Sequence, residues 1–539
     1  MSMKQNLLYK WAIAVILLIA SFTTGFADTK ITSLDQIEKG FAIKIYPYGK
    51  AGQSSFALAC AGDGSSLTSF SKAGDGDEWT LMEADSGYYY LKNELDCYWA
   101  YQDSLTSHSL TCTADKDSAV KVEITWNSRY DGFCFFNRKD GKGLNNLEHA
   151  NLYNWCSTPS DYNSDSNTTF IIYLNTNVEV DGIKYNLDPT DKTAEICGIK
   201  GEISDNIEIP EYVEYANERF LVTSLGNDCF KSRTNLTSIT LPNGIKSLGT
   251  WCFFGCTSLT SITLPNSLTS LGSGCFHGCS SLTSIVLPNS LASLGSGCFS
   301  QCSSLTSIDL PSSLSSLPNY SFYNCSNLTS ITLPNDITSL GESCFRGCGR
   351  LASIILPNNV KSLGASCFYG CAGLTNVTLS DNLTSMGESC FKNCNRLVSI
   401  TIPNGVTSLG SSCFMGCEKL TSISLPNGIT SMGDYCFKDC NLLSSINMPG
   451  DIKSLGNWCF HECRSLTNIA LPNGITSLGT WCFASCSSLT SITLPNSITS
   501  IGDYCFDWCG SLTNVTLPNG ITSLGLYCFC GCSNLVRNT

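Results

Sequence analysis

Apolar and polar positions recur with a fixed period over the C-terminal part of the chain. One unit runs from Leu264 to Val286 and spans 23 residues. The pattern starts at Leu241, Leu264, Leu287, Leu310, Leu333, Leu356, Leu379, Ile402, Leu425, Met448, Leu471, Leu494 and Leu517, without an insertion. A period of this length is typical of solenoids, in which each unit buries its apolar face only against its neighbours.

Each unit contains a short strand followed by a turn. Leu259, Ile262 and Leu264 follow the spacing L-x-x-L-x-L, which predicts inward-pointing strand residues, with Ser261 and Thr263 pointing outward. The next two residues, 265–266, are Pro and Asn, for which we predict a turn, since Pro fixes φ and Asn tolerates a left-handed conformation.

The second half of the unit predicts another inward segment and a short helical turn. Gly272 allows a tight corner, and position 273 and its equivalents are mostly Ser, Thr, Asp or Asn, the residues that cap helices. Cys275, Phe276 and Cys279 then face the core. The Phe recurs in every unit from Phe230 to Phe529, which predicts a packed spine.

The net charge of −13 is confined to the front of the molecule. Residues 28–208 contain 15 Lys and Arg against 28 Asp and Glu, a balance of −13, whereas residues 209–539 contain 14 against 16. No basic patch suited to nucleic acid or anionic lipid is present.

Residues 1–27 are predicted to be an export signal, with Lys4 and Lys10 before an apolar stretch that ends in small residues. A membrane anchor is the alternative, although the stretch is short for a span. The mature chain is then secreted or at the outer cell surface, without a membrane span.

Residues 28–175 lack the period and predict an all-β domain of short aromatic strands. Their order of strands and turns resembles ricin-type β-trefoil domains. The candidate sugar-stacking residues are Trp79, Tyr89, Trp99 and Trp155. An aromatic-rich core without a ligand is the other interpretation. Residues 176–208 are expected to form a short β lead-in to a solenoid over 209–539.

The pattern L-P-x-x-[IL]-x-S-[LI]-G-x-x-C-F-x-x-C-x-x-L-T-x-[IV]-x resembles the BspA-type leucine-rich repeat of bacterial surface antigens. The resemblance covers about 330 residues, and Cys252 and its equivalents stand where that family commonly has Ala. It implies a surface or secreted protein that binds matrix proteins or neighbouring cells, and no enzyme activity.

The chain has 33 Cys, of which 27 lie at or beyond Cys229. Buried free thiols, disulfides between neighbouring units and metal binding are the three interpretations. Free thiols that pack as small hydrophobes are favoured, and metal binding is the least favoured because the spacing is not C-x-x-C and the cysteines flank a core Phe.

No catalytic, cofactor-binding or metal-binding residues are predicted. Motifs for phosphate, nucleotide, serine-hydrolase or zinc-peptidase chemistry are absent from the sequence. Two of the four His, His277 and His461, share one variable repeat position and are interpreted as exposed filler.

Two surfaces are candidates for partner binding. The first is the outward strand face, represented by Ser261, Thr263, Ser330, Thr332, Ser399, Thr401, Ser491 and Thr493. The second is a row of aromatics just before the first Cys of five successive units, formed by Tyr435, Trp458, Trp481, Tyr504 and Tyr527. The alternative for the outward strand face is that it is only solvated. The alternative for the aromatic row is that the rings pack laterally between units.

The sequence therefore predicts an adhesin-like protein that binds an extracellular protein through the solenoid. In the alternative, the N-terminal domain reads a glycan and the solenoid is a spacer. Within the solenoid, Pro318 in place of the corner Gly and Ser321 in place of the first Cys predict that the fourth unit is the weakest.

Overall fold

The chain divides into two compact units, the first containing β1–β15 and the second containing the repeats from Val222 onward. The computed structural model describes residues 177–201, 204–215 and 218–536 with their side chains, and before them the backbone of the strands β1–β13. The predicted export signal lies outside the described residues, and the predicted domain boundaries at 175 and 208 stay predictions. No helix in the described part is long and apolar enough to cross a membrane.

The first unit is built from a closed ring of strands. The ring runs β2–β5–β6–β9–β10–β13 and returns to β2. The hairpins β3–β4, β7–β8 and β11–β12 connect successive ring strands. The bounds are β1 Thr29–Lys30, β2 Ala42–Pro47, β3 Leu58–Ala59, β4 Thr68–Ser69, β5 Trp79–Asp85, β6 Tyr88–Asn93, β7 Tyr98–Ser104, β8 Ser107–Thr113, β9 Val122–Asn127, β10 Gly132–Asn137, β11 Gly143–Leu147, β12 Leu152–Ser157 and β13 Phe170–Leu174. Six ring strands with three hairpins are the strand pairing of a β-trefoil, in agreement with the predicted trefoil-like fold.

A short β segment precedes the repeats. It contains the hairpin β14–β15 and the strands β16 and β19, with β18 pairing antiparallel to β19. The bounds are β14 Asn177–Val180, β15 Ile183–Asp188, β16 Thr193–Ile199, β17 Asn206–Glu208, β18 Tyr212–Tyr215 and β19 Glu218–Leu225. Within this sheet, parallel pairing starts at β19 and β21, where Ser224 and Leu225 lie opposite Ser247 and Leu248, while β17 pairs in parallel with β20 in a separate sheet.

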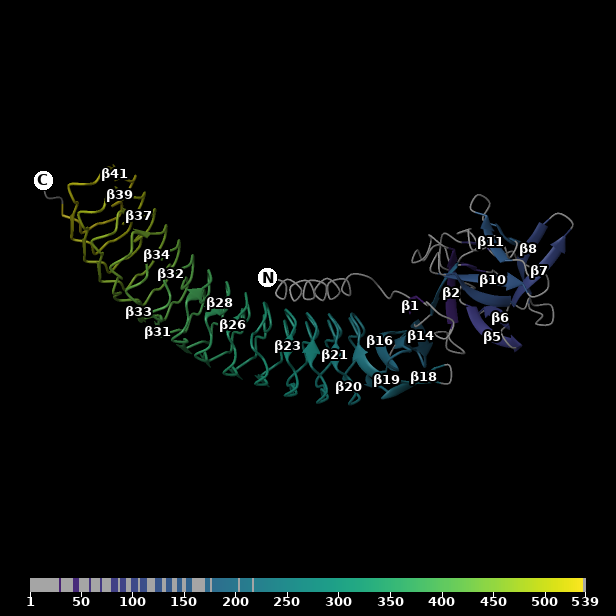
Figure 1. Cartoon of the computed structure of the whole chain (residues 1–539). Coiled ribbons are helices and arrows are strands. Elements are labelled where there is room, and N and C mark those ends of the chain that lie inside the picture. Colours follow the sequence, from purple (N-terminus) through teal and green to yellow (C-terminus); the bar gives the residue numbers. More distant parts are fainter. Residues whose placement is uncertain are drawn as a thin grey trace, which may run out of the picture. The chain divides into compact units, whose positions relative to one another are not determined.

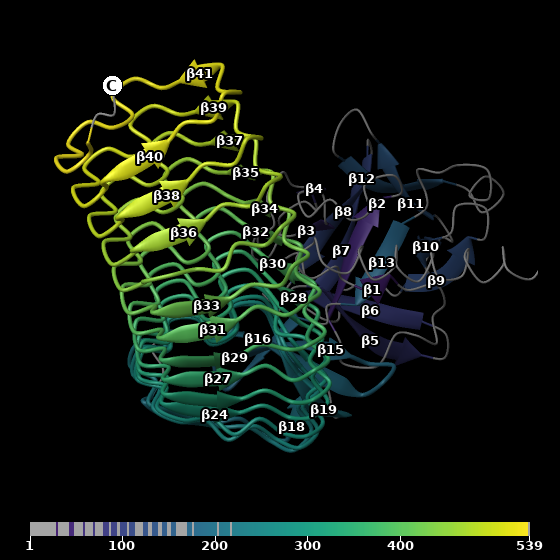
Figure 2. The same cartoon turned by 90° about the vertical axis from the view of Figure 1, so that its left-hand side faces the viewer.

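Most of the repeats then contribute strands to two parallel ladders. The first follows the S-I-T segment, and its strands lie side by side in Figure 2. Its bounds are β20 Ser238–Thr240, β24 Ser307–Asp309, β25 Ser330–Thr332, β27 Ser353–Ile355, β29 Asn376–Thr378, β31 Ser399–Thr401, β33 Ser422–Ser424, β36 Asn468–Ala470, β38 Ser491–Thr493 and β40 Asn514–Thr516. We call its solvent side the Ser/Thr face.

The second ladder follows the S-L segment on another side of the coil. Its bounds are β21 Ser247–Leu248, β22 Ser270–Leu271, β23 Ser293–Leu294, β26 Ser339–Leu340, β28 Ser362–Leu363, β30 Ser385–Met386, β32 Ser408–Leu409, β34 Ser431–Met432, β35 Ser454–Leu455, β37 Ser477–Leu478, β39 Ser500–Ile501 and β41 Ser523–Leu524. Because the paired strands lie in register with their equivalents one repeat away, as Ser270 and Leu271 do with Ser293 and Leu294, the repeats form a curved solenoid (Figure 1).

The core is a set of identical columns. Phe276 and its equivalents stack face to face, with centroids 5.2–5.6 Å apart along the spine from Phe230 to Phe529, and those from Phe230 to Phe506 are buried. Leu259 and Ile262 are buried on the strand, and Cys275 and Cys279 on the turn. The predicted inward residues and the Phe spine are confirmed.

The turn between the two ladders differs from the predicted helical turn. Its backbone is a pair of tight turns in which two positions per repeat are left-handed. The residue before the first Cys has a φ between 52° and 64°, and the residue before the second Cys has a φ between 54° and 76°. Asn266, which would tolerate this conformation, does not adopt it. The correction has a steric reason: two left-handed residues reverse the chain twice within the C-F-x-x-C segment, so no helical turn can form.

Two further predictions about this turn name the right residue types for the wrong physical reason. The corner Gly does not have the positive φ that would require Gly. It is required because the repeats pack closely: a Cβ on Gly479 would lie 2.6 Å from the backbone of Gly456 and Asn457 in the preceding repeat. The residue after it does not cap a helix within its own unit. Asp434 and Asn457 each accept a hydrogen bond from the backbone N–H of the same position in the next repeat, at 2.7 and 2.9 Å.

Candidate binding surfaces

The five aromatics at the C-terminal repeats form a continuous stack, which we call the aromatic ladder. Successive ring centroids from Tyr435 to Tyr527 lie 6.1, 4.9, 4.4 and 5.2 Å apart, with ring planes within 19° of parallel. Tyr435 and Tyr527 are exposed, and the three rings between them are half-buried. The rings therefore pack laterally against one another, as one interpretation expected, while part of the stack stays accessible to a partner.

The backbone explains why this column accepts such different residues. All its members are left-handed, including Gly274, Ser343 and Trp458. A left-handed position imposes a conformational cost on any residue other than Gly, and stacking on the neighbouring ring offsets part of it for Trp and Tyr.

Cations lie against the aromatic side chains of the same turn. The Lys438 amine lies 5.3 Å from the centre of the Trp458 ring, and the Arg346 guanidinium lies 4.4 Å from that of Tyr369. Lys231 similarly lies 4.7 Å from Trp251. Such contacts hold long side chains against the ring faces in these repeats.

The Ser/Thr face is exposed as predicted. Its residues Ser261, Thr263, Ser330, Thr332, Ser399, Thr401, Ser491 and Thr493 are all exposed to solvent. Beside them, a further Thr column donates hydroxyl hydrogen bonds to the carbonyl of the preceding repeat, as Thr329 does to Thr306 at 3.1 Å. These hydroxyls are therefore used in stacking the repeats, whereas the Ser/Thr face remains available.

One part of this face is not flat. A groove of about 390 Å³ lies between β25 and β27, with a rim of Ser330 and Thr332 and inner residues that include Ile331 and Leu333. Ile355, on the other side, replaces the usual Thr and is 71% exposed. Sequence reasoning missed the groove, although the Ile in a Thr column was the visible signal.

The interpretation of His461 as exposed filler is wrong. His461 is only 7% exposed, because its ring packs 4.6 Å from Trp458 and 6.2 Å from Trp481. Its counterpart His277 is half-buried and stacks on Phe254 at 4.9 Å. Burial lowers the pKa of both imidazoles, that of His461 to about 4.

The described cysteines are free thiols, which is the favoured interpretation, and those of the repeat core are buried. The second Cys of each repeat donates its S–H to the carbonyl of the Phe in the preceding repeat, as Cys279 does to Phe253 at 3.2 Å. Burial raises the pKa of Cys275 to about 11 and that of Cys256 to about 12. Protonated thiols are therefore part of the hydrogen bonding of the core.

The candidate glycan residues lie on four strands of the first unit. Trp79 is on β5, Tyr89 on β6, Trp99 on β7 and Trp155 on β12. Their side chains lie outside the described part of the chain, so sugar stacking by them stays a prediction.

Comparisons with known proteins agree with this architecture. The family model described as the BspA type leucine rich repeat region matches residues 223–352, 338–467 and 453–538. A leucine-rich repeat protein from Bacteroides ovatus ATCC 8483 is 31% identical, with a TM-score of 0.60, over 66% of this chain and 93% of that one. No curated protein matches the chain.

Two other solved structures are similar to separate parts of the chain. A leucine rich cell surface protein from Faecalibacterium prausnitzii A2-165 is 26% identical over 67% of this chain and 93% of that one, with a TM-score of 0.46. The designed three-fold symmetric protein ThreeFoil is 16% identical over 24% of this chain and 97% of that one, with a TM-score of 0.21.

The stacked ladders, the Phe spine and the 23-residue period define a leucine-rich-repeat solenoid protein. Within that class, the chain belongs to the BspA-type leucine-rich repeat family.

Proposed function

We propose that this chain is a secreted or cell-surface interaction protein that binds an extracellular protein through its solenoid. The observation that carries the proposal is the aromatic ladder. Trp and Tyr dominate binding hot spots, and here five of them are aligned in a pre-ordered stack, so little side-chain entropy is lost on binding.

The Ser/Thr face supplies a second, polar contact region. Its hydroxyls can donate and accept hydrogen bonds, and the groove beside Ile355 can receive one apolar side chain of a partner. A solenoid presents such features over an extended surface, which suits binding to large proteins.

The test is the triple variant Trp458→Ser, Trp481→Ser and Tyr504→Ser, measured for binding to a panel of immobilised extracellular matrix proteins. Ser fits this left-handed column, since Ser343 and Ser366 occupy it. We expect binding to fall at least tenfold. Some loss of thermal stability is expected as well, because each ring pair contributes about 0.5–1.5 kcal/mol, so binding is measured well below the midpoint.

The matched control is Trp251→Ser with Tyr320→Ser, two exposed aromatics of the same column outside the ladder. The control should keep binding. Unchanged binding by the triple variant, or equal loss in the control, would contradict a contact role for the ladder.

The second candidate function is glycan binding by the first unit. The closed six-strand ring with three hairpins favours it, because that pairing is the one expected for a ricin-type domain. In this case the whole chain binds a glycan array, Trp99→Ala and Trp155→Ala abolish the signal, and the triple ladder variant leaves it unchanged.

A further inference from the structure

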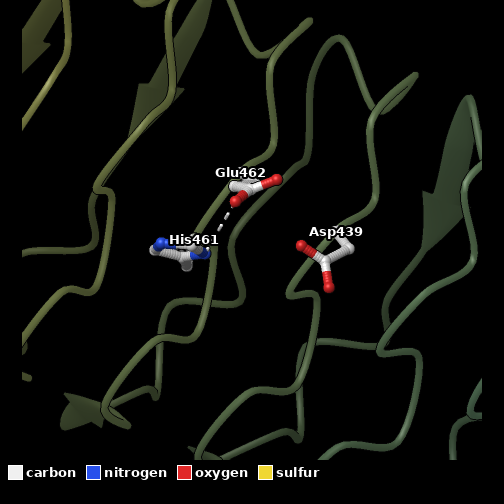
Figure 3. Close-up of side chains that lie close together, drawn as sticks. All are labelled: Asp439, His461 and Glu462. Carbon is white, nitrogen blue, oxygen red and sulfur yellow. Dashed lines mark ion pairs between the residues drawn. The ribbon is translucent and has the colours of Figure 1, made fainter.

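One side-chain cluster next to the aromatic ladder combines an imidazole with two carboxylates. Asp439, His461 and Glu462 come from two adjacent repeats, and one ligand atom of each lies within 4.8 Å of the other two (Figure 3). Asp439 and Glu462 occupy the same left-handed column, with φ values of 62° and 60°. The Asp439 N–H donates to the His461 carbonyl at 2.9 Å, which fixes the two repeats in register at this point.

The imidazole is directed at the acids with one nitrogen unused. His461 Nδ1 is buried and has no hydrogen-bond partner, while it lies 4.0 Å from Oε1 of Glu462. A buried polar atom without a partner costs free energy, which a ligand at that atom would recover. The lone pair of a neutral imidazole nitrogen is a common metal ligand, so the unpartnered Nδ1 beside two carboxylates can bind a cation.

The carboxylates are arranged to complement that nitrogen. Arg464 holds Oε2 of Glu462 at 2.9 Å, which leaves Oε1 facing the imidazole. Asp439 is half-buried, and desolvation raises the pKa of its carboxyl group, whereas Lys438 acts in the opposite direction. Both acids remain partly exposed, so an ion can enter from solvent.

We propose that Asp439, His461 and Glu462 form a binding site for a divalent transition-metal ion such as Zn²⁺. Imidazole nitrogens and carboxylate oxygens are both ligands that this ion takes in proteins, and solvent or a partner protein would complete the coordination. Bonds of about 2.0–2.2 Å place ligands about 3.5 Å apart, so the side chains must close by about an ångström.

The rest of the solenoid provides a comparison for each ligand. His277 is the equivalent of His461 in an earlier repeat. The positions equivalent to Asp439 and Glu462 around it are Gly255 and Gly278, so no carboxylate faces His277 from them. Asn393 replaces Asp439 in an earlier repeat with a φ of 59°, Gln301 replaces Glu462 with a φ of 60°, and Ala484 replaces His461 in the next repeat. Each ligand can therefore be removed by a residue that the fold already accepts at that position.

The experiment is calorimetric titration of the untagged full-length chain with Zn²⁺. The variants are His461→Ala, Asp439→Asn and Glu462→Gln, and the matched control is His277→Ala. We expect one site to disappear in His461→Ala and its affinity to fall at least tenfold in the other two. His277→Ala should bind like the parent chain, and Lys438→Met, which removes a nearby cation, should bind more tightly.

Exposed thiols are the competing explanation for zinc binding, so Cys530→Ser is titrated in parallel. Retained binding in Cys530→Ser supports the proposal. Loss of the site in Cys530→Ser, unchanged binding in His461→Ala, or no binding by the parent chain would overturn it. Thermal unfolding of each variant without metal shows that the fold is intact.

Discussion

At the scale of single residues, the corner glycines are fixed by close packing of the backbone. A Cβ on Gly479 would lie 2.6 Å from backbone atoms of the preceding repeat, whereas a Cβ on Gly428 has no atom within 4 Å. We expect Gly479→Ala to lower stability by about 1–3 kcal/mol, the usual cost of overpacking. Gly428→Ala should change it by less than about 0.5 kcal/mol. Denaturant unfolding of the two variants measures the difference, and equal effects would show that the repeats can move apart.

The cysteines should differ sharply in chemical reactivity. Cys530 is exposed, whereas Cys505 and Cys509 one repeat earlier are buried, and burial raises the pKa of the Cys505 thiol. Because the thiolate is the reactive form, iodoacetamide at pH 8 should modify Cys530 at least tenfold faster than Cys505. Peptide mapping by mass spectrometry follows both sites. Rapid labelling of Cys505 in the native protein would mean that the terminal repeats open readily.

The sequence predicted which residues are buried better than it predicted the backbone between them. Leu259, Phe276 and Cys279 were assigned inward from periodicity alone, and all are buried. The left-handed positions were missed because their column mixes Gly, Ser, Trp and Tyr, which share no propensity. The cluster of Asp439, His461 and Glu462 was missed because its members become neighbours only when adjacent repeats stack.

At the scale of elements, the fourth repeat interrupts the second ladder. The sheet that ends at β23 does not continue to β26, and only an isolated pairing of Leu317 with Leu340 lies between them. In most other repeats the corner Gly donates to the carbonyl of the apolar residue before the corner of the preceding repeat, as Gly341 does to Leu317 at 2.8 Å. Pro318 has no N–H to donate, so this bond cannot form.

We therefore expect amides of residues 311–332 to exchange about tenfold faster than those of the flanking repeats. Pro318→Gly restores the missing donor and should reduce the difference, because Gly is the residue that the other repeats have at this position. Hydrogen exchange with mass spectrometry measures both chains. Uniform protection in the parent chain would refute the prediction.

The same ladder is interrupted between β30 and β32, where no Pro occurs. Strand existence and order were predictable from the L-x-x-L-x-L spacing, but such gaps depend on small shifts between repeats. The groove between β25 and β27 on the Ser/Thr face is of the same kind, and a periodic sequence cannot specify which pair of repeats separates.

At the scale of the whole molecule, the solenoid followed from the period and the first unit followed from the order of strands and turns. The binding partners of the two units do not follow from the period or from the strand order, because the side chains that distinguish one surface from another lie at the variable positions. The aromatic ladder is an example: core packing does not fix the residue type at its five positions, yet the five rings form an ordered stack.

The thiol core makes stability of the whole solenoid sensitive to alkaline pH. Burial raises the pKa of Cys275 to about 11 and that of Cys256 to about 12, above the 9.0 of an unperturbed thiol. The unfolded chain therefore loses these protons at lower pH than the folded chain, so the stabilisation is complete below pH 9 and is lost as pH rises toward 12. Each such Cys contributes a slope of about 1.4 kcal/mol per pH unit.

Because buried thiols recur in every repeat, we expect a constant thermal midpoint from pH 7 to about 8.5 and a steep fall above pH 9. Cys275, Cys298 and Cys344 are each the first Cys of their repeat. Replacing all three by Ala removes three titrating groups and should make the fall of the thermal midpoint above pH 9 shallower. The variant loses some packing, so its midpoint at pH 7 serves as its own reference. Lost packing changes the midpoint at pH 7, whereas lost thiol titration changes the slope of the midpoint above pH 9. Lys and Tyr also titrate in this range, but they do so in both chains and leave the difference between the two slopes unchanged. An unchanged slope in the variant would mean that thiol ionisation does not control alkaline unfolding.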